Sequence, residues 1–164
     1  MEIVLARIDD RLIHGQVATV WSKETRCDRI IICNDDVAND AIRKTLLVQV
    51  APPGVKVNVL EVEKAIRVYK NFKNENSRVL LLFTNPTDVV EMVEGGVDIK
   101  SVNIGGMSFR EGKKMITNFI SVNEEDIKAF LKLKERGVEL EIRKVPGDRK
   151  KNLIELIQKK NHNH

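Results

Sequence analysis

The chain has 164 residues, 42% of them hydrophobic, which suits one compact domain with its own core. Its net charge is only +4, its basic residues are spread out and its aromatic content is 4%, so single-strand nucleic-acid binding has little support. No run of about 18 apolar residues occurs, and Met1-Glu2 opens on a strand-like run without a basic-then-apolar leader, so we expect a cytoplasmic protein without membrane spans.

Apolar patterning predicts alternating strands and helices along the chain. The first strand, at 3–6, is followed by a helix at 15–23, and the second, at 29–33, by a helix at 37–50 whose buried side is formed by Ala41, Leu46, Leu47 and Val50. A strand at 55–60 precedes a helical stripe of Val62, Ala65, Ile66 and Tyr69. The continuous apolar run at 79–83 indicates a central strand covered on both faces.

The second half continues the alternation. Asn85-Pro86 starts a helix that stops at Gly95, with Asn85 as N-cap and Pro86 at the first helical position. A strand at 99–104 and a short extended piece within 113–122 precede a helix that runs from 123–126 to Gly137. The alternating segment 138–142 is typical of a strand near an edge with one wet face, and a last amphipathic helix follows around 153–157.

Repeated strand–helix units predict an α/β fold with a mostly parallel central sheet and helices on both faces. We expect one domain over residues 1–160 and a frayed tail at 161–164, whose histidines belong to a disordered end and not to a metal site. Cys27 and Cys33 lack partners at metal-binding spacing. No residue pattern requires a metal or another cofactor.

The stretch from Ala6 to Gln16 gathers charged residues at the hand-over from the first strand to the first helix. His14, the only histidine before the extreme C-terminus, can attack phosphorus with a ring nitrogen. The amides of Gly15 and Gln16 at a helix start would face an anion, and two arginines, Arg7 and Arg11, would balance its charge. Either Asp9 or Asp10 would orient the imidazole through its other N–H.

Further polar segments follow other strands at the same edge of the sheet, where ligands of such folds bind. They are possible rim residues of a shallow site around His14: Asn34, Asp35, Pro86, Gly105, Gly106 and Met107. The first two are more economically an N-cap and first-turn signal, and the glycine pair is about equally a plain turn or a phosphate-facing loop. We expect an apolar rim from Leu12, Ile13 or Met107.

Other interpretations of the charged stretch stay open on spacing alone. A loop histidine beside an Asp-Asp-Arg cluster is often only a solvated turn with salt bridges, as on a binding or scaffold protein without chemistry. A receiver-like module would need an aspartate after the third strand, but the sequence there is Leu60-Glu61.

Several motifs resemble one bacterial family, in its order, over about residues 3–145. They are Ala6 to Gln16, Asn34-Asp35-Asp36, Arg43-Lys44-Thr45-Leu46, Ala51-Pro52-Pro53, Phe83-Thr84-Asn85-Pro86, Asn103-Ile104-Gly105-Gly106-Met107 and Asp126-Ile127-Lys128-Ala129-Phe130. The chain thereby resembles the IIB components of the mannose/fructose/sorbose family of the phosphoenolpyruvate-dependent sugar phosphotransferase system, the sorbose type most closely.

The resemblance implies a phosphohistidine–sugar phosphotransferase subunit. His14 would accept a phosphoryl group from the phosphohistidine of a IIA protein or domain, with Arg11, Asp9 and Asp10 assisting and Arg7, Gly15 and Gln16 binding phosphate. The group would pass to a sugar of the mannose, fructose or sorbose class during uptake through the membrane components IIC and IID. The protein would thus be cytoplasmic and associate with a membrane permease, without nucleic acid.

Overall fold

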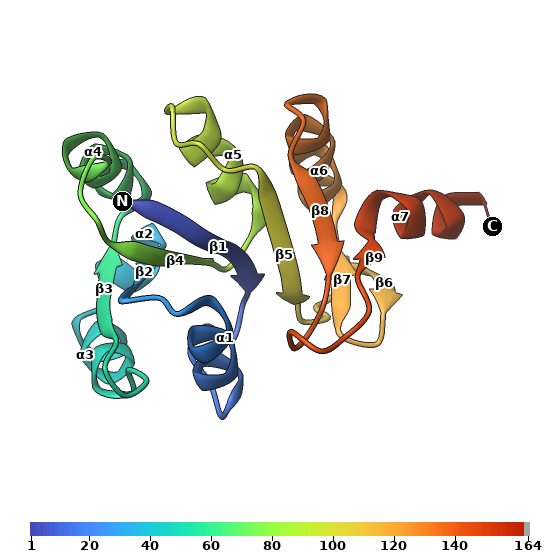
Figure 1. The fold of residues 1–164 in the computed structure, drawn as a ribbon. Helices are drawn as coiled ribbons and strands as arrows, with labels where there is room; N and C mark the ends of the chain where they lie inside the picture. The colour runs from blue at the N-terminus through green and yellow to red at the C-terminus, as the bar shows by residue number, and fades with distance from the viewer. Residues whose placement is uncertain (163–164) are drawn as a thin grey trace.

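The computed structural model describes residues 1–162, with side chains described through residue 160. Within this range seven strands form one sheet in the order β3-β2-β4-β1-β5-β8-β9 (Figure 1). These strands are β1 (Glu2–Asp9), β2 (Arg29–Cys33), β3 (Lys56–Leu60), β4 (Arg78–Phe83), β5 (Ser101–Gly106), β8 (Glu139–Ile142) and β9 (Lys151–Asn152). All neighbours pair in parallel except β8 and the short β9. The predicted mostly parallel sheet is confirmed.

Helices cover both faces of this sheet, as predicted. They are α1 (Val17–Thr25), α2 (Asp35–Ala38), α3 (Ala41–Gln49), α4 (Val62–Phe72), α5 (Pro86–Glu94), α6 (Glu124–Glu135) and α7 (Leu153–His162). Because successive strand side chains point to opposite faces, β2 sends Ile31 into one core cluster and Ile30 and Ile32 into the other. The first cluster packs under α4, α5 and α6, and the second under α1 and α2.

The central strand and the helix after it form as predicted. β4 lies between β2 and β1, and its side chains from Val79 onward are buried. The Asn85 side chain accepts a hydrogen bond from the Asp88 amide, Pro86 takes the first turn, and Gly95 is the C-cap of α5. The strand and the helix cap predicted from local residues are therefore both confirmed.

The helix predicted at 37–50 is wrong in two respects. The segment forms two helices, because Asp40 caps α3 by accepting the Arg43 amide at 3.1 Å and so interrupts the run. None of the residues of α3 is buried, and Leu46 and Val50 of the predicted buried side are 55% and 54% exposed. The helix covers the edge of the sheet beside β3, where only its Leu47 packs against the core.

The segment at 113–122 is a hairpin of β6 (Lys114–Thr117) and β7 (Ile120–Val122). Met107 joins it through backbone hydrogen bonds to Phe119 and Ser121, so the hairpin stands beside the end of β5. At the C-terminus, α7 continues to His162, two residues into the predicted frayed tail, and residues 163–164 lie outside the described part.

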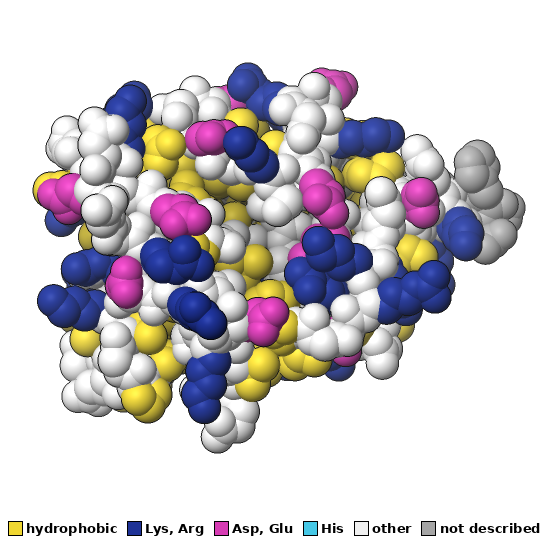
Figure 2. Space-filling view, viewed as in Figure 1, with side chains coloured by type: hydrophobic (Ala, Val, Ile, Leu, Met, Phe, Trp, Pro, Cys, Tyr) yellow, Lys and Arg dark blue, Asp and Glu magenta, His cyan; other side chains and the backbone are white. Residues whose placement is uncertain are grey.

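Charge is mixed on the surface seen in Figure 2, where basic and acidic side chains alternate around apolar ones. None of the helices described within residues 1–162 is both long enough and apolar enough to span a bilayer.

Asp88 gives the fold a pH dependence near neutrality. Its burial, with Asp35, Glu91 and Asp36 nearby, raises its pKa to about 6, although a hydrogen bond from Asn85 opposes the shift. The folded pKa exceeds the unfolded value of about 3.9, so this contribution to stability is complete below pH 4 and is lost as pH rises through 6.

Asp88→Asn should therefore remove a pH-dependent loss of stability. We expect the variant to gain about 1 kcal/mol over the unmodified chain between pH 4 and pH 7, a figure reduced for the partial exposure of this group. Urea unfolding at both pH values measures the gain, with Asp98→Asn, an exposed carboxylate that is not among the charges raising the Asp88 pKa, as control. Equal changes in the two variants would contradict this account of Asp88.

Candidate functional site

The charged stretch begins inside the sheet, because β1 continues to Asp9, three residues beyond the predicted end. With a period of two, Arg7 and Asp9 share one face of β1, while Ala6 and Ile8 enter the core on the other. Both charged side chains are buried. Burial of two ionic groups at a strand end is costly unless they are paired, and here they pair with each other at 3.1 Å.

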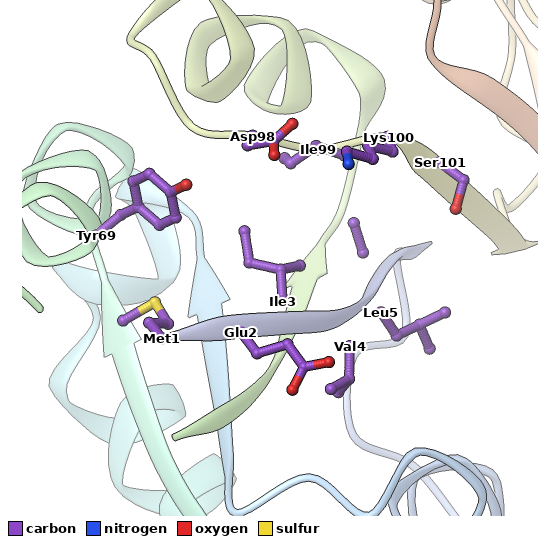
Figure 3. Close-up of a pocket in the computed structure, with 11 residues that line it drawn as sticks. Met1, Glu2, Ile3, Val4, Leu5, Tyr69, Asp98, Ile99, Lys100 and Ser101 are labelled. Atoms are coloured by element: carbon purple, nitrogen blue, oxygen red, sulfur yellow. The ribbon is translucent and has the colours of Figure 1, made fainter. Parts of the chain in front are cut away.

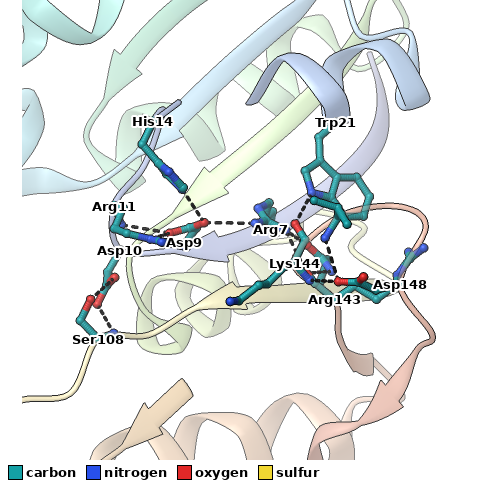
Figure 4. A network of polar contacts seen from close by, with 12 residues as sticks. Arg7, Asp9, Asp10, Arg11, His14, Trp21, Ser108, Arg143, Lys144 and Asp148 are labelled. Atoms are coloured by element: carbon teal, nitrogen blue, oxygen red, sulfur yellow. Dashed lines mark hydrogen bonds and ion pairs between the residues drawn. The ribbon is translucent and has the colours of Figure 1, made fainter. Parts of the chain in front are cut away.

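A tight reversal brings His14 back over Asp9. The Leu12 amide donates to the Asp9 carbonyl at 2.9 Å, and both Leu12 and Gly15 have positive φ, 59° and 49°. His14 Nε2 lies 3.1 Å from Asp9 Oδ2 (Figure 4), and the His14 side chain is 26% exposed. The ring therefore bonds the protein through Nε2, while Nδ1 is the nitrogen that this contact leaves unused.

Asp9 is the central hydrogen-bond acceptor of the site. Its carboxylate accepts from Arg7 Nη2 at 3.1 Å, from the Arg11 amide at 3.1 Å and from Arg11 Nε at 3.2 Å, besides its bond with His14. Burial alone would raise the pKa of Asp9, but the His14 hydrogen bond and the two arginine charges outweigh it and hold this pKa below the ordinary value. Asp9 is therefore an anion at neutral pH, fixed behind the imidazole.

The two arginines occupy different positions. Arg11 is 49% exposed, and within the described chain its two terminal nitrogens make no hydrogen bond, so they are available to a ligand. Arg7 is buried, and its guanidinium bonds Asp9, Asn103 and the Arg143 carbonyl. Burial lowers the Arg7 pKa, and the neighbouring Asp9 opposes that shift. The predicted phosphate contact of Arg7 does not fit this placement, whereas that of Arg11 does.

The two candidate carboxylates, Asp9 and Asp10, have different partners. Asp10 accepts from the Ser108 amide at 2.7 Å and from its hydroxyl at 2.9 Å, so it holds the segment after β5. Asp9 alone of the two contacts His14. Gly15 and Gln16 are exposed immediately before α1, whose first N–H groups have no intrahelical acceptor.

The sequence analysis did not predict the row of hydrogen-bonded polar side chains, the polar ladder, that lies behind the site. Arg7, Asn103 and Glu141 are direct neighbours across the parallel strands β1, β5 and β8. Arg143 forms a two-point ion pair with Glu141 at 2.9 Å, and the guanidiniums of Arg7 and Arg143 lie over the Trp21 ring at 5.2 and 5.1 Å. Glu141 is consequently buried, so the predicted wet face of this strand is confirmed at the exposed Glu139 and wrong at Glu141. The sign of this ladder in the sequence was the presence of Asn103 and Glu141 within otherwise apolar strands.

The glycine pair lies within β5 and makes room for these charges. A Cβ on Gly105 would lie 2.1 Å from the Arg7 guanidinium carbon, and one on Gly106 would lie 3.0 Å from Asp9 Oδ1 and Arg11 Nη2. The pair is therefore neither a plain turn nor a phosphate-facing loop. Its function is to let two side chains of β1 lie flat on the neighbouring strand.

Gly105→Ala should displace Arg7 and loosen Asp9. We expect a loss of about 1–3 kcal/mol in unfolding free energy, since the new methyl meets a buried guanidinium. Chemical denaturation measures it against Gly147→Ala, where no atom lies within 4 Å of the added Cβ and the change should stay within about 0.5 kcal/mol. Equal effects of the two substitutions would show that Arg7 yields without cost.

Most of the predicted rim residues make contacts within the fold that cap helices or join neighbouring elements. Asn34 caps α2 and donates to Thr84 Oγ1, Asp35 accepts the Val62 amide at 2.9 Å, and Pro86 is buried in the first turn of α5. The capping interpretation of Asn34-Asp35-Asp36 thus accounts for the observed contacts.

The predicted apolar rim is also wrong, since Leu12, Ile13 and Met107 are all buried. Leu12, at its positive φ, turns into the core under α1. Two exposed apolar side chains, Phe109 at 61% and Met115 at 51%, lie on and just after the segment that follows β5. They line a cavity of about 350 Å³ together with Arg11, Ser108, Asn118 and Lys144. Apolar contact area therefore lines the same cavity as Arg11, the arginine that bonds Asp9.

A second cavity of about 320 Å³ lies at the other end of β1 (Figure 3). β1 pairs with β5 only from Arg7 onward, so Ile3 and its neighbours face the segment 98–101 across a gap. None of the charged residues around His14 lines it.

Comparison with known proteins links these residues to one family. The family model described as "PTS system sorbose subfamily IIB component" matches residues 3–164. The chain is 62% identical over 159 residues to the mannose-specific EIIAB component of Escherichia coli K12, covering 97% of this chain and 49% of that protein. It is 55% identical over 157 residues to the sorbose-specific EIIB component of Klebsiella pneumoniae, covering 96% of each.

Solved structures agree with the sequence comparisons. The IIBSor domain of the sorbose permease from Klebsiella pneumoniae superposes with a TM-score of 0.94 at 55% identity, covering 97% of this chain and 98% of that one. This chain spans about half the length of the mannose-specific relatives it matches.

Proposed function

Since the chain belongs to the sorbose subfamily of IIB components of the phosphotransferase system, we propose that it is a phosphoryl carrier whose acceptor atom is Nδ1 of His14. The observation that carries the proposal is the 3.1 Å contact between His14 Nε2 and Asp9. With the proton on Nε2 donated to a buried carboxylate, the lone pair of the neutral ring is on Nδ1. The activity is then that of a protein-N(pi)-phosphohistidine–sugar phosphotransferase.

The proposed transfer has two steps. The Nδ1 lone pair attacks the phosphorus of a donor phosphohistidine, and the P–N bond of the donor breaks with its electron pair returning to the donor ring. Positive charge develops on the His14 ring, where the Asp9 carboxylate stabilises it through Nε2–H. In the second step a sugar hydroxyl attacks the phosphorus, the P–Nδ1 bond breaks, and the hydroxyl proton is released to solvent or a base of the acceptor complex.

The phosphoryl charge meets Arg11 and the start of α1. The Arg11 side chain is 49% exposed and shares the Asp9 carboxylate with the imidazole, and the amides of Gly15 and Gln16 precede a helix whose N-terminal dipole favours an anion. Arg7 acts indirectly, because it holds Asp9 in place. Asp10 takes no direct part.

The proposed partners follow from the family. A IIA protein or domain supplies the phosphoryl group, and a sugar of the mannose, fructose or sorbose class, held by IIC and IID, receives it. The protein would work in the cytoplasm as one domain over residues 1–160, docked on a membrane permease. Phe109 and Met115, exposed beside Arg11, supply apolar area for the transient contacts that two successive partners need.

Reconstitution of the relay tests this function. The chain is incubated with phosphoenolpyruvate, the general phosphotransferase proteins and a IIA protein, and intact mass and peptide mapping follow. One phosphoryl mass on the His14 peptide, labile to acid, is the expected result. A phosphorylated cognate IIA that leaves the chain unmodified would contradict the carrier function, and the binding-protein interpretation would replace it.

A further inference from the structure

We propose that Asn103, Glu141 and Arg143 are positioning residues for phosphoryl transfer at His14, acting through Arg7 and Asp9. This inference rests on the proposed function and deepens it. It assigns to β5, β8 and the segment after β8 a role in setting the ring geometry and the working pH of the acceptor. None of the three residues contacts His14 itself.

The first part of the network joins His14 to β5 without interruption. From His14 Nε2 the contacts pass to Asp9 Oδ2 and on to Arg7 Nη2, each at 3.1 Å. The other terminal nitrogen of Arg7, Nη1, donates to Asn103 Oδ1 and to the Arg143 carbonyl. Arg7 therefore bridges Asp9 to a side chain on the neighbouring strand.

The second part fixes Asn103 in turn. Its amide nitrogen donates to Glu141 Oε1 and to the Arg143 carbonyl, both at 3.2 Å, which leaves its oxygen facing Arg7. A flipped Asn103 would present its NH₂ group to the guanidinium and lose these bonds. Glu141 and Arg143 therefore decide which end of Asn103 meets Arg7.

Arg143 is anchored from several sides. Its Nη1 donates to the Pro146 carbonyl at 3.1 Å, and its guanidinium lies over the ring of Trp21. The Trp21 Nε1 donates to the Lys144 carbonyl at 2.9 Å, which ties the segment after β8 to α1 (Figure 4). Several contacts therefore hold the far end of the ladder, and Arg7, over the same ring, lies between it and Asp9.

The charges around this network determine what loosening it would do. Asp9 faces Arg7, Arg11 and His14, whereas Arg7 faces Asp9 and, across β5, Glu141. Arg143 faces chiefly Glu141, with Glu24 of α1 and Glu139 of β8 nearby. An Arg7 held in place neutralises part of the Asp9 charge and fixes the carboxylate that contacts the imidazole.

Asn103→Leu removes the link while keeping the number and branching of the side-chain heavy atoms. With Arg7 less firmly held, Asp9 stabilises the imidazolium more strongly, and a smaller share of His14 is neutral and nucleophilic at pH 7. We expect the midpoint of the pH–rate profile of phosphorylation to rise by about one pH unit, with about a tenfold loss of rate at pH 7 that is largely recovered near pH 8.

The imidazole itself supplies the second readout. Nitrogen-15 NMR of labelled histidine reports which ring nitrogen carries the proton, and we expect the share of the Nε2–H tautomer among neutral rings to rise in Asn103→Leu, because a less neutralised Asp9 accepts more strongly from Nε2–H. This measurement needs no phosphoryl donor. A failure of the proposed function, seen as no phosphorylation of the unmodified chain, is therefore distinguished from a failure of this inference.

Two further variants supply a second test and a control. Glu141→Gln retains an oxygen for Asn103 and removes the ion pair with Arg143, and we expect a shift in the same direction but smaller, which decides the matter if Asn103→Leu does not fold. Arg67→Ala breaks the exposed pair with Glu63 on α4 and should shift neither readout. A folded Asn103→Leu or Glu141→Gln with unchanged pH midpoint and tautomer, whatever its thermal stability, would overturn the proposal.

Discussion

Replacing His14 by Gln should abolish phosphoryl uptake and leave the fold in place. The glutamine side chain retains an amide that can donate to Asp9, but it has no ring nitrogen with a lone pair to attack phosphorus. The residue is partly exposed at the end of the β1–α1 reversal, so the unfolding free energy should change by no more than about 0.5–1 kcal/mol.

Mass spectrometry after the relay reaction measures this effect. Lys44→Gln, an exposed change on α3 outside the site, is the control and should be phosphorylated like the unmodified chain. Phosphorylation of His14→Gln at an undiminished level would place the acceptor elsewhere and remove the basis for the assigned roles of Asp9 and Arg11.

Replacing Asp9 by Asn has two large effects with one cause. The carboxylate is buried and accepts from Arg7, Arg11 and His14, so its loss leaves the buried Arg7 guanidinium without its anion. Breaking a buried ion pair in this way costs about 3–5 kcal/mol of unfolding free energy. The neutral amide no longer stabilises the imidazolium, so we expect transfer to slow by about 100-fold or more.

Urea unfolding and rapid-quench phosphorylation separate the two effects. Asp10→Asn is the matched control, because Asp10 holds only Ser108, and it should keep most of its transfer rate. If Asp9→Asn matched this control in stability and rate, the central role assigned to Asp9 would be wrong.

The ion pairs of Asp9 should also make the unfolding free energy depend on pH. Because the folded pKa of Asp9 is depressed, its contribution is complete above the unfolded carboxyl value of about 3.9 and is lost as pH falls through the folded value. The acid-induced loss of stability should therefore be smaller in Asp9→Asn than in the unmodified chain.

Local signals in the sequence were sufficient for much of the fold. The continuous apolar run of β4 and the Asn85-Pro86 cap of α5 each depend on neighbours a few residues away, and both form as predicted. The break before α3 was missed because the cap of Asp40 competes with a helical pattern that continues on both sides.

The site was predictable only where it is local. Asp9, Arg11 and His14 lie within six residues, and one reversal brings them together. The ladder of Arg7, Asn103 and Glu141 depends on the register of three strands far apart in the chain, which no spacing reveals. The predicted apolar rim failed because a positive φ at Leu12 turns that side chain inward.

The bond that holds the phosphoryl group is the most direct test of the mechanism. Phosphorus-31 and nitrogen-15 NMR of the phosphorylated, histidine-labelled chain identify the nitrogen that carries phosphorus. We predict a bond to Nδ1 of His14, with Nε2 still protonated toward Asp9. A phosphoryl group on Nε2 of His14, or on any other residue, would contradict the account, because the Asp9 contact would then have to break before transfer.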